Sequence, residues 1–449
     1  MTNTALVVGA SGIIGSNLAQ ELLANHWTTY GLARRPGTDI AGLQPVAADL
    51  LDVASLETAL ADIQPTHVFI TSWMRNDTEA ENIRVNSAMV RNLLAVLGPK
   101  HSVQHVALVT GLKHYLGPFE AYVSGGVAPP TPLRESQPRL ALDNFYYAQE
   151  DEVYAAAARD GFTWSIHRPH TIIGKAVGNL MNLGTTLAVY ASICKATGRP
   201  FRWPGSRAQW EGLSDVTDAR VIAKQLVWAA ATEAARNEAY NVVNGDVFRW
   251  SQLWGRLAEW FGVEAVGFDG TIQPLEAGMA DDADLWREIA TKNGLAEADL
   301  SRLASPWHTD LDLGRPIEVM TDMANSRKRG FTVFQPTEDS FFDLFAKLRE
   351  DRLIPYGGVG AGLAPARTFA PLQRFRSTVG GGKPCPYIHH SPPPCSLPPK
   401  PPPASSPPPA RCPPKPWLCP MPPAACWPKP SWPTATSRPS TEWRWTALR

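Results

Sequence analysis

Three glycines near the N-terminus are spaced for binding the phosphates of a dinucleotide. Gly9, Gly12 and Gly15 stand in the run Gly-Ala-Ser-Gly-Ile-Ile-Gly, directly after the apolar residues 5–8. Glycine at these positions allows a tight turn, lets backbone N–H groups approach a pyrophosphate and brings the next helix close to the strand. The motif predicts a dinucleotide site, with a purely structural turn as the alternative. The expected contacts are Gly9, Ser11, Gly12, Ile13 and Gly15.

The residues after the second apolar segment distinguish between the two nicotinamide cofactors. An NAD site places an acid there for the ribose 2′-hydroxyl, whereas an arginine accommodates the 2′-phosphate of NADP. The sequence has Arg34 and Arg35 after residues 28–33, with no acid at that position. Guanidinium groups match phosphate oxygens in a bidentate way. We therefore predict NADPH, with a solvated arginine pair as the alternative. Asp49 and Leu50 are expected beside the adenine, unless Asp49 caps a helix.

A proton donor for carbonyl chemistry is harder to identify. Most short-chain dehydrogenases carry Tyr-x-x-x-Lys on one helix, which places a phenol and an ammonium a turn apart. Neither Tyr146 nor Tyr147 is followed by a lysine at that spacing. Lys113 lies instead just beyond the apolar residues 105–109, where ligands bind at the edge of a doubly wound sheet. Either catalysis has been lost, or the lysine comes from a separate element.

The elements that must position these residues alternate between strand and helix. Short apolar runs predict strands, and apolar residues at helical spacing predict helices between them. This alternation indicates β-α-β units, so we predict an α/β fold with a Rossmann-type, doubly wound parallel sheet. The expected strands are residues 5–8, 28–33, 46–48, 67–70, 105–109 and 164–167, and the expected helices are 17–24, 54–63, 79–97 and 146–159.

Two further regions follow this NADP-binding core of residues 1–174. Residues 175–350 mix helical patterns (221–232, 250–261 and 282–293) with a strand-like piece at 239–243, and should supply the last strands and a smaller substrate-binding lobe. Residues 351–449 hold 26 of the 42 prolines and form a low-complexity tail that we expect to be disordered. A polyproline ligand and an out-of-frame translation are alternative explanations for this tail.

Five motifs together resemble one family. They are the Gly-Ile-Ile-Gly loop, Ala-Arg-Arg-Pro at 33–36, Thr-Gly-Leu-Lys-His-Tyr-Leu-Gly-Pro-Phe-Glu at 110–120, Asn-Phe-Tyr-Tyr-Ala-Gln-Glu-Asp at 144–151 and Trp-Ser-Ile-His-Arg-Pro at 164–169. Over residues 5–350 the chain resembles the progesterone 5β-reductase/iridoid synthase-like family, an atypical branch of the extended short-chain dehydrogenases.

The resemblance implies NADPH-dependent 1,4-reduction of an enone or enal. Tyr146 would stabilise the enolate oxygen and Lys113 would reinforce it, with Tyr147 as the fallback phenol. Further cofactor contacts implied by the family are Ser72, Trp73, Val109, Tyr146, Ile172, Asn179, Leu180 and Met181. An NADP-dependent carbonyl reductase or sugar-nucleotide epimerase, and a non-catalytic NADP sensor, remain alternatives.

Composition narrows the remaining possibilities. The 42 Lys and Arg balance 42 Asp and Glu, which argues against nucleic-acid or membrane-surface partners that bind through excess charge. Only Cys194 lies in the first 350 residues, which suits a reducing, cytoplasmic location, and no ligand cluster predicts a metal site. We expect a small conjugated carbonyl substrate as the partner. Family members are often dimers, so a homodimer is a further expectation.

Overall fold

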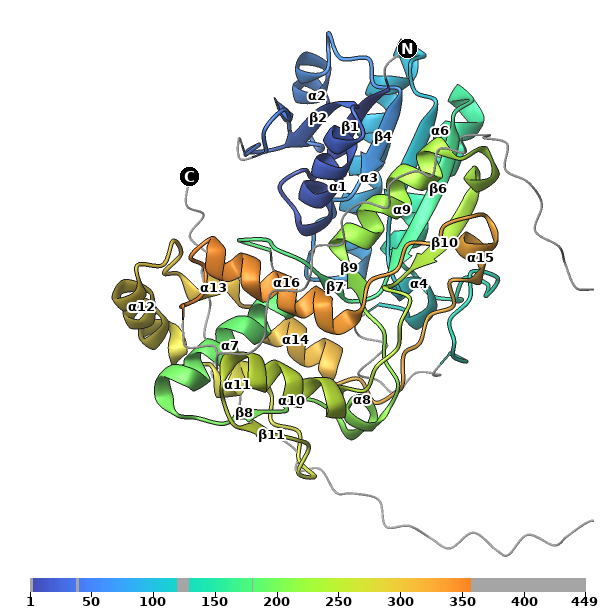
Figure 1. Cartoon of the computed structure of the whole chain (residues 1–449). Helices are drawn as coiled ribbons and strands as arrows, with labels where there is room; N and C mark the ends of the chain where they lie inside the picture. The colour runs from blue at the N-terminus through green and yellow to red at the C-terminus, as the bar shows by residue number, and fades with distance from the viewer. Residues whose placement is uncertain (1–2, 38–39, 119–128, 180, 357–449) are drawn as a thin grey trace, which may run out of the picture. The chain divides into compact units, whose positions relative to one another are not determined.

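A parallel seven-stranded sheet organises the computed structural model, which describes residues 3–37, 40–118, 129–179 and 181–356. Its strand order is β10-β6-β5-β4-β1-β2-β3, and every adjacent pair is parallel. The strand order reverses beside β1, which pairs with β2 on one side and β4 on the other (Figure 1). Ligands of such sheets bind at the carboxyl ends of the strands beside this reversal. The strands are β1 (Thr4–Val8), β2 (Thr28–Ala33), β3 (Gln44–Ala47), β4 (His67–Ile70), β5 (His105–Val109), β6 (Thr163–Pro169) and β10 (Glu238–Val242).

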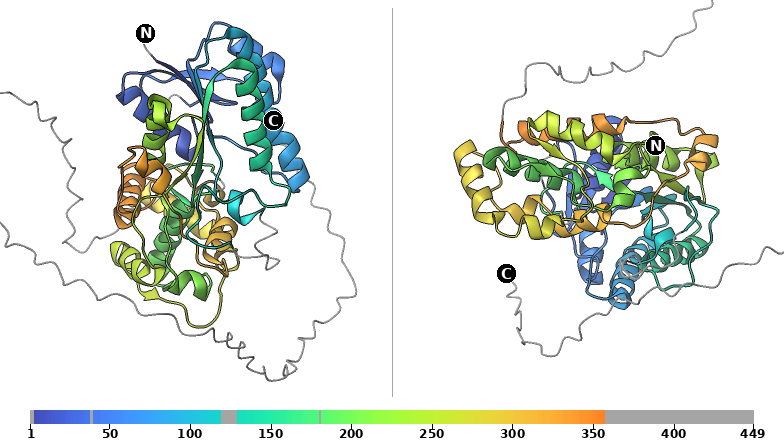
Figure 2. Two further views of the ribbon diagram at one scale, coloured as in Figure 1. Left: turned by 90° about the vertical axis from the view of Figure 1, so that its right-hand side faces the viewer. Right: turned by 90° about the horizontal axis from the view of Figure 1, so that it is seen from below.

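Helices cover both faces of this sheet (Figures 1 and 2). On one face α1 (Ile13–Ala24) packs beside α9 (Ala219–Ala231), and on the other α3 (Glu79–Leu97) packs beside α6 (Phe145–Asp160). The side chains of β1 alternate between the two cores, because successive residues of a strand point to opposite faces. Ala5 and Val7 belong to the α1/α9 core, and Leu6 and Val8 to the α3/α6 core. We call the sheet and these covering helices, with α2 (Val53–Ala59), the sheet half.

The longer helices of residues 183–350 other than α9 form a separate hydrophobic core, which we call the helical lobe. Its centre is aromatic: Trp203, Trp250, Trp254 and Trp286 are all buried there. The main helices of the helical lobe are α7 (Leu183–Thr197), α10 (Trp250–Phe261), α12 (Asp282–Asn293), α14 (Pro306–Leu313) and α16 (Thr337–Glu350). The shorter elements of the whole described chain, inside and outside this lobe, are α4 (Lys113–Leu116), α8 (Arg207–Glu211), α11 (Leu275–Gly278), α13 (Leu300–Leu303), α15 (Ala324–Lys328), η1 (Gly98–Lys100) and η2 (Glu233–Ala235). Two short strand pairs are also present, β7 (Ile172–Ile173) with β9 (Thr217–Asp218) and β8 (Phe201–Arg202) with β11 (Ala265–Val266).

The predicted fold class is confirmed, several elements have the predicted boundaries, and the others differ from them by one to four residues. The largest differences are of four residues: α1 begins at Ile13 although a helix was predicted from residue 17, and α2 ends at Ala59 although the apolar spacing predicted a helix to residue 63. The chain leaves the helix in a turn in which the Ile63 N–H donates to the Leu60 carbonyl at 3.0 Å, so the apolar spacing continues after the helix has ended.

Some expectations stay predictions. Leu180 and residues 357–449 of the tail lie outside the described residues. Within the described part of the chain, no helix has both the length and the apolar character needed to span a bilayer. The domain limits, the cytoplasmic location and the homodimer are untested.

Candidate active site

The glycine turn connects β1 to α1 through two close approaches of the backbone. Gly9 has φ +88°, and a Cβ there would lie 2.8 Å from the Cβ of Ser72. A Cβ on Gly15 would lie only 2.2 Å from the carbonyl oxygen of Gly9, so α1 can begin this close to the turn only with glycine. Gly12 caps α1 without a side-chain hydrogen bond, and the first turn carries no acid. The N–H groups at the start of α1 are therefore suited to bind an anionic group.

A cavity of about 640 Å³ opens beside this turn. Eight of the residues predicted to bind the cofactor line it, which brings together parts of the chain from four strand ends. They are Gly9, Ser11, Arg34, Arg35, Asp49, Leu50, Ser72 and Trp73. Their convergence follows from the parallel sheet, because the carboxyl ends of β1, β2, β3 and β4 meet at one edge.

The cavity suits a phosphate-bearing dinucleotide. Arg34 and Arg35 are exposed, and neither makes an ion pair with another residue of the described chain. The Ser72 hydroxyl oxygen is buried without a hydrogen-bond partner among those residues, which favours a ligand that can supply one. Asp49 accepts a hydrogen bond from the Leu51 N–H at 2.9 Å and does not cap α2, a role that Asp52 fills.

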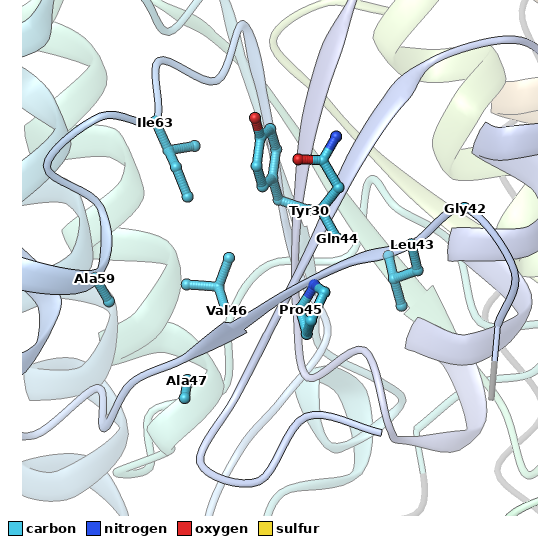
Figure 3. Close-up of a pocket in the computed structure, with 9 residues that line it drawn as sticks. All are labelled: Tyr30, Gly42, Leu43, Gln44, Pro45, Val46, Ala47, Ala59 and Ile63. Carbon is cyan, nitrogen blue, oxygen red and sulfur yellow. The ribbon is translucent and has the colours of Figure 1, made fainter. Parts of the chain in front are cut away.

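A second hollow, of about 630 Å³, lies along the edge strand β3 (Figure 3). Tyr30, Gln44, Val46 and Ile63 are among the residues that line it, and none of its lining residues is a predicted catalytic or cofactor residue. Figure 3 shows that most of the side chains that line it are apolar, with Tyr30 and Gln44 as the polar ones. We therefore place the chemistry in the cavity beside the glycine turn.

Lys113 lies next to that cavity, held among aromatic rings. It begins α4, just after β5, and is only 7% exposed. Its Nζ lies 4.9 Å from the ring centroid of Trp73, 4.9 Å from that of Phe145 and 5.8 Å from that of Tyr146. Ring faces attract a cation at such distances, so the ammonium can remain charged although it is buried. Because Trp73 also lines the cavity, Lys113 and the cavity are neighbours.

Tyr146 is positioned by the start of α6 and by a glycine opposite its hydroxyl. The cap residue Asn144 accepts a hydrogen bond from the Tyr146 N–H at 3.0 Å and donates one to the Lys113 carbonyl at 2.8 Å, so one side chain links both elements. A Cβ on Gly111 would lie 3.1 Å from the Tyr146 hydroxyl oxygen and 3.5 Å from the Pro169 carbonyl. The phenol therefore lies at the carboxyl ends of β5 and β6.

Tyr147 has a different environment. Its hydroxyl donates to the His114 carbonyl at 2.5 Å and accepts from the Leu140 N–H at 3.0 Å. Burial raises the pKa of this phenol. Both hydrogen bonds are to backbone groups, so the Tyr147 hydroxyl holds α4 to the loop that contains Leu140. The two tyrosines, which the sequence alone could not separate, thus have distinct surroundings.

Glu150 occupies the position four residues after Tyr146, where the lysine of most short-chain dehydrogenases would be. It is 1% exposed and lies 3.2 Å from Arg168 Nη2, 2.9 Å from Arg139 Nη2 and 3.6 Å from His114 Nδ1. Burial alone would raise the pKa of this carboxyl, but the nearby His114, the charge of Arg168 and the hydrogen bonds from Arg168 and Arg139 outweigh it and hold the pKa at about 2. Glu150 therefore fixes α6 to α4 and β6.

The other predicted cofactor residues are placed less closely. Val109 and Ile172 are partly buried and pack with Ile13 in the α1/α9 core. The Asn179 side chain accepts a hydrogen bond from the Met181 N–H at 2.9 Å, and no hydrogen bond in the described ranges joins either residue to the glycine turn. Asn144, Gly111 and Glu150 were missed as positioning residues, although Asn144 stands at a recognisable cap position before a helix.

Comparisons with known proteins agree with this site. Residues 5–355 match the family described as the PRISE-like Rossmann-fold domain. The chain is 39% identical over 365 residues to (S)-8-oxocitronellyl enol synthase ISY1 of Nepeta cataria, covering 79% of this chain and 93% of that protein. It is 39% identical over 366 residues to 3-oxo-Delta(4,5)-steroid 5-beta-reductase of Arabidopsis thaliana, again covering 79% and 93%.

Solved structures match at the level of the fold. UDP-glucose 4-epimerase from Bifidobacterium longum, in complex with NAD+ and UDP, has a TM-score of 0.55 at 14% identity, covering 78% of this chain and 99% of that one. A putative epimerase from Burkholderia cenocepacia has a TM-score of 0.54 at 18% identity, covering 78% and 98%. The predicted oxidoreductase class is confirmed, and solved proteins that share the fold bind NAD+. The chain belongs to the PRISE-like Rossmann-fold family.

Proposed function

We propose that this protein reduces the C=C bond of conjugated carbonyl compounds by 1,4-addition of hydride from NADPH. One observation carries the proposal: Lys113 and Tyr146, from separate elements, meet beside Trp73, which also lines the dinucleotide cavity. The names of the relatives, a steroid 5-beta-reductase and an enol synthase, support a reaction that passes through an enolate.

Arg34 and Arg35 support NADPH as the cofactor. Both line the cavity, and both follow β2, the strand end that faces the adenosine ribose in such folds. Two guanidinium groups at this position would bind the 2′-phosphate, which NADH lacks.

The bound cofactor would supply the hydride to the β-carbon of the substrate. As it is added, negative charge develops on the carbonyl oxygen. The Tyr146 hydroxyl would donate a hydrogen bond to that oxygen, and the Lys113 ammonium would strengthen the same stabilisation. A donor fixed in advance in a site that excludes water is worth about 3 kcal/mol of the barrier. Asn144, Phe145 and Gly111 would hold the two groups in place.

A carbonyl reductase or sugar-nucleotide epimerase is the second candidate, because the solved neighbours include epimerases. The buried anionic Glu150, at the position of their usual lysine, opposes it. This carboxylate would raise the pKa of a nearby phenol, whereas a lysine lowers it. A non-catalytic NADP sensor is the third candidate, and the convergence of Lys113 and Tyr146 opposes that one.

The test is incubation of the full chain with 2-cyclohexen-1-one and NADPH deuterated at the transferred position. We expect cyclohexanone with deuterium on the carbon β to the carbonyl. Deuterium on the carbinol carbon of an allylic alcohol would replace our proposal with a carbonyl reductase. Tight NADPH binding without turnover of this substrate or of progesterone would favour a sensor.

A further inference from the structure

A buried histidine directly after β6 joins two charged groups through its ring nitrogens. His170 follows Pro169, the last residue of β6, and is 5% exposed. Its Nδ1 lies 2.8 Å from Oδ1 of the buried Asp215, and its Nε2 lies 2.6 Å from Nη1 of Arg315. The proposed reaction uses none of these three groups, although they meet at the carboxyl end of a strand that borders Tyr146.

The hydrogen bonds determine the protonation state of this ring. A guanidinium group can only donate, so Nε2 of His170 accepts from Arg315 and carries no proton. The proton of the neutral ring is then on Nδ1, which donates to the Asp215 carboxylate. Asp215 also accepts from the N–H of Thr321 at 2.7 Å and from its hydroxyl at 3.2 Å. A second proton, on Nε2, would remove the acceptor and place an imidazolium against the guanidinium.

Arg315 connects the ring to the helical lobe. Its guanidinium also binds Asp312 of α14, and its carbonyl accepts a hydrogen bond from the Ser206 hydroxyl at 2.5 Å. The Thr171 hydroxyl donates to Oδ2 of Asp312 at 2.9 Å. Two consecutive residues after β6 therefore tie the end of this strand to α14 and to the residue that follows it. The residues that we call the His170 cluster are His170, Asp215, Asp312 and Arg315.

The end of β6 also borders the Tyr146 hydroxyl. A Cβ on Gly111 would lie 3.1 Å from that hydroxyl oxygen and 3.5 Å from the Pro169 carbonyl, so both oxygens face the space beside Gly111. His170 is the residue after this carbonyl. None of the residues of the His170 cluster lines the dinucleotide cavity. The cluster is therefore placed to act on the position of the helical lobe beside the phenol, and not on the binding of the cofactor.

We propose that His170 is a positioning residue for the reduction: its neutral ring holds Arg315, and this contact keeps the helical lobe in place against the end of β6 beside Tyr146. This inference rests on the proposed function. Protonation or substitution of His170 breaks the contact, which weakens substrate binding and leaves NADPH binding intact. The charged or titratable groups around the ring are Asp215, Arg315 and Asp312, with His308 3.9 Å from the Asp312 carboxylate.

The kinetic test follows the reduction of 2-cyclohexen-1-one by the full chain from about pH 8 to about pH 5, the range in which histidine titrates. For the wild type we expect the KM of the enone to rise about tenfold toward the acid end, the size of one lost hydrogen bond to a charged group, with little change in kcat. His170→Leu should have the high KM throughout. His170→Gln should keep the low KM throughout, because its amide can donate to Asp215 and accept from Arg315 without titrating. A rise in KM that persists in His170→Gln would overturn the inference.

His105→Gln is the matched control. His105 is also a buried histidine, but it begins β5 and lies at the other end of the sheet from the Tyr146 hydroxyl, so this variant should keep the wild-type pH profile of KM. The dissociation constant of NADPH, from fluorescence titration, should be the same in His170→Leu as in the wild type. Equal losses for cofactor and enone would mean that the substitution damages the whole fold, and would overturn the inference.

Hydrogen exchange separates this inference from the proposed reaction. Mass spectrometry measures the protection of residues 306–315 relative to α10 without substrate, at the same two pH limits and corrected for the intrinsic rates. We expect lower protection at the acid limit in the wild type, no such loss in His170→Gln and low protection at both limits in His170→Leu. This result would support the contact even if no enone is reduced, and only the proposed function would then fail. Equal wild-type protection at both limits would overturn the inference.

Discussion

The sheet half and the helical lobe position their functional groups by different means. In the sheet half, the ends of parallel strands bring together Gly9, Arg34 and Ser72, and the geometry of the backbone fixes the site. In the helical lobe, α14 contacts the segment between β4 and α3 through side chains, with the Cζ of Arg75 4.1 Å from the ring centroid of Trp307. The strand topology alone predicts the first kind of site. The second kind of contact depends on how side chains pack.

The largest expected effect is the loss of folding stability in acid, which arises from buried histidines of the sheet half. The sheet half buries three histidines whose pKa values burial lowers: His67 to about 4, His105 to about 3 and His167 to about 4. The unfolded chain takes up protons near pH 6.5 and the folded chain does not, so stability should fall as the pH drops from 6.5 to about 4. The loss is about 3 kcal/mol for each histidine by pH 4.

Urea unfolding at several pH values measures this loss. His105→Gln should reduce the dependence on pH, since an amide can still bond to Thr163 and Ser165 without taking up a proton. A stability that is constant from pH 6.5 to 4 would contradict the neutral state of these rings.

Gly15→Val tests how strictly the backbone fixes the cofactor site. A Cβ here would lie 2.2 Å from the Gly9 carbonyl, so α1 must move away from the turn. We expect NADPH affinity to fall more than about 100-fold, equivalent to almost 3 kcal/mol, as measured by fluorescence titration. Gly278→Ala in the helical lobe is the matched control, because nothing lies within 4 Å of its Cβ position. Equal losses of NADPH affinity in the two variants would show that cofactor binding does not depend on the close approach of α1 to the glycine turn.

Glu150→Gln tests the contact between α6, α4 and β6. Loss of this buried charge leaves Arg168 without its carboxylate, and breaking such a pair costs about 3 kcal/mol of folding free energy. Glu152→Gln, on the same helix, removes an exposed pair with Arg91 and should cost about 1 kcal/mol or less. Chemical denaturation of both variants gives the comparison, and similar losses would mean that Glu150 contributes no more than a surface ion pair.

Arg34→Ala and Arg35→Ala should have the smallest effect. Because both side chains are exposed, we expect each to weaken NADPH binding about tenfold and to leave NADH binding nearly unchanged. Isothermal titration with the two cofactors measures the difference. An equal loss for NADH would remove the argument for a 2′-phosphate site.

Much of the sheet half was predictable from the sequence, because its signals lie within short segments of the chain. The glycine spacing, the apolar strands and the arginines after the second strand each depend on a few neighbouring residues. The choice between Tyr146 and Tyr147 was not predictable, because it depends on where α6 begins and on which hydroxyl reaches the His114 carbonyl. Asn144, the cap residue of α6, was the available signal for where this helix begins.

The helical lobe was predicted as helices of a substrate-binding lobe, without the packing between them. Residues 250–261 and 282–293 form helices with the expected limits, yet nothing in the sequence indicated that Trp307 would lie against Arg75. That contact joins segments more than 200 residues apart, which no local pattern records.

The most direct test of the account replaces each tyrosine by phenylalanine. In single-turnover reactions of 2-cyclohexen-1-one with bound NADPH, Tyr146→Phe should react about 100-fold more slowly, because it lacks the hydrogen bond to the developing enolate. Because Tyr146 is also an expected cofactor contact, its NADPH affinity is measured in the same variant and should fall far less than the rate. Tyr147→Phe should keep the wild-type rate and lose only about 1 kcal/mol of stability from its backbone hydrogen bonds. A wild-type rate in Tyr146→Phe would contradict the account.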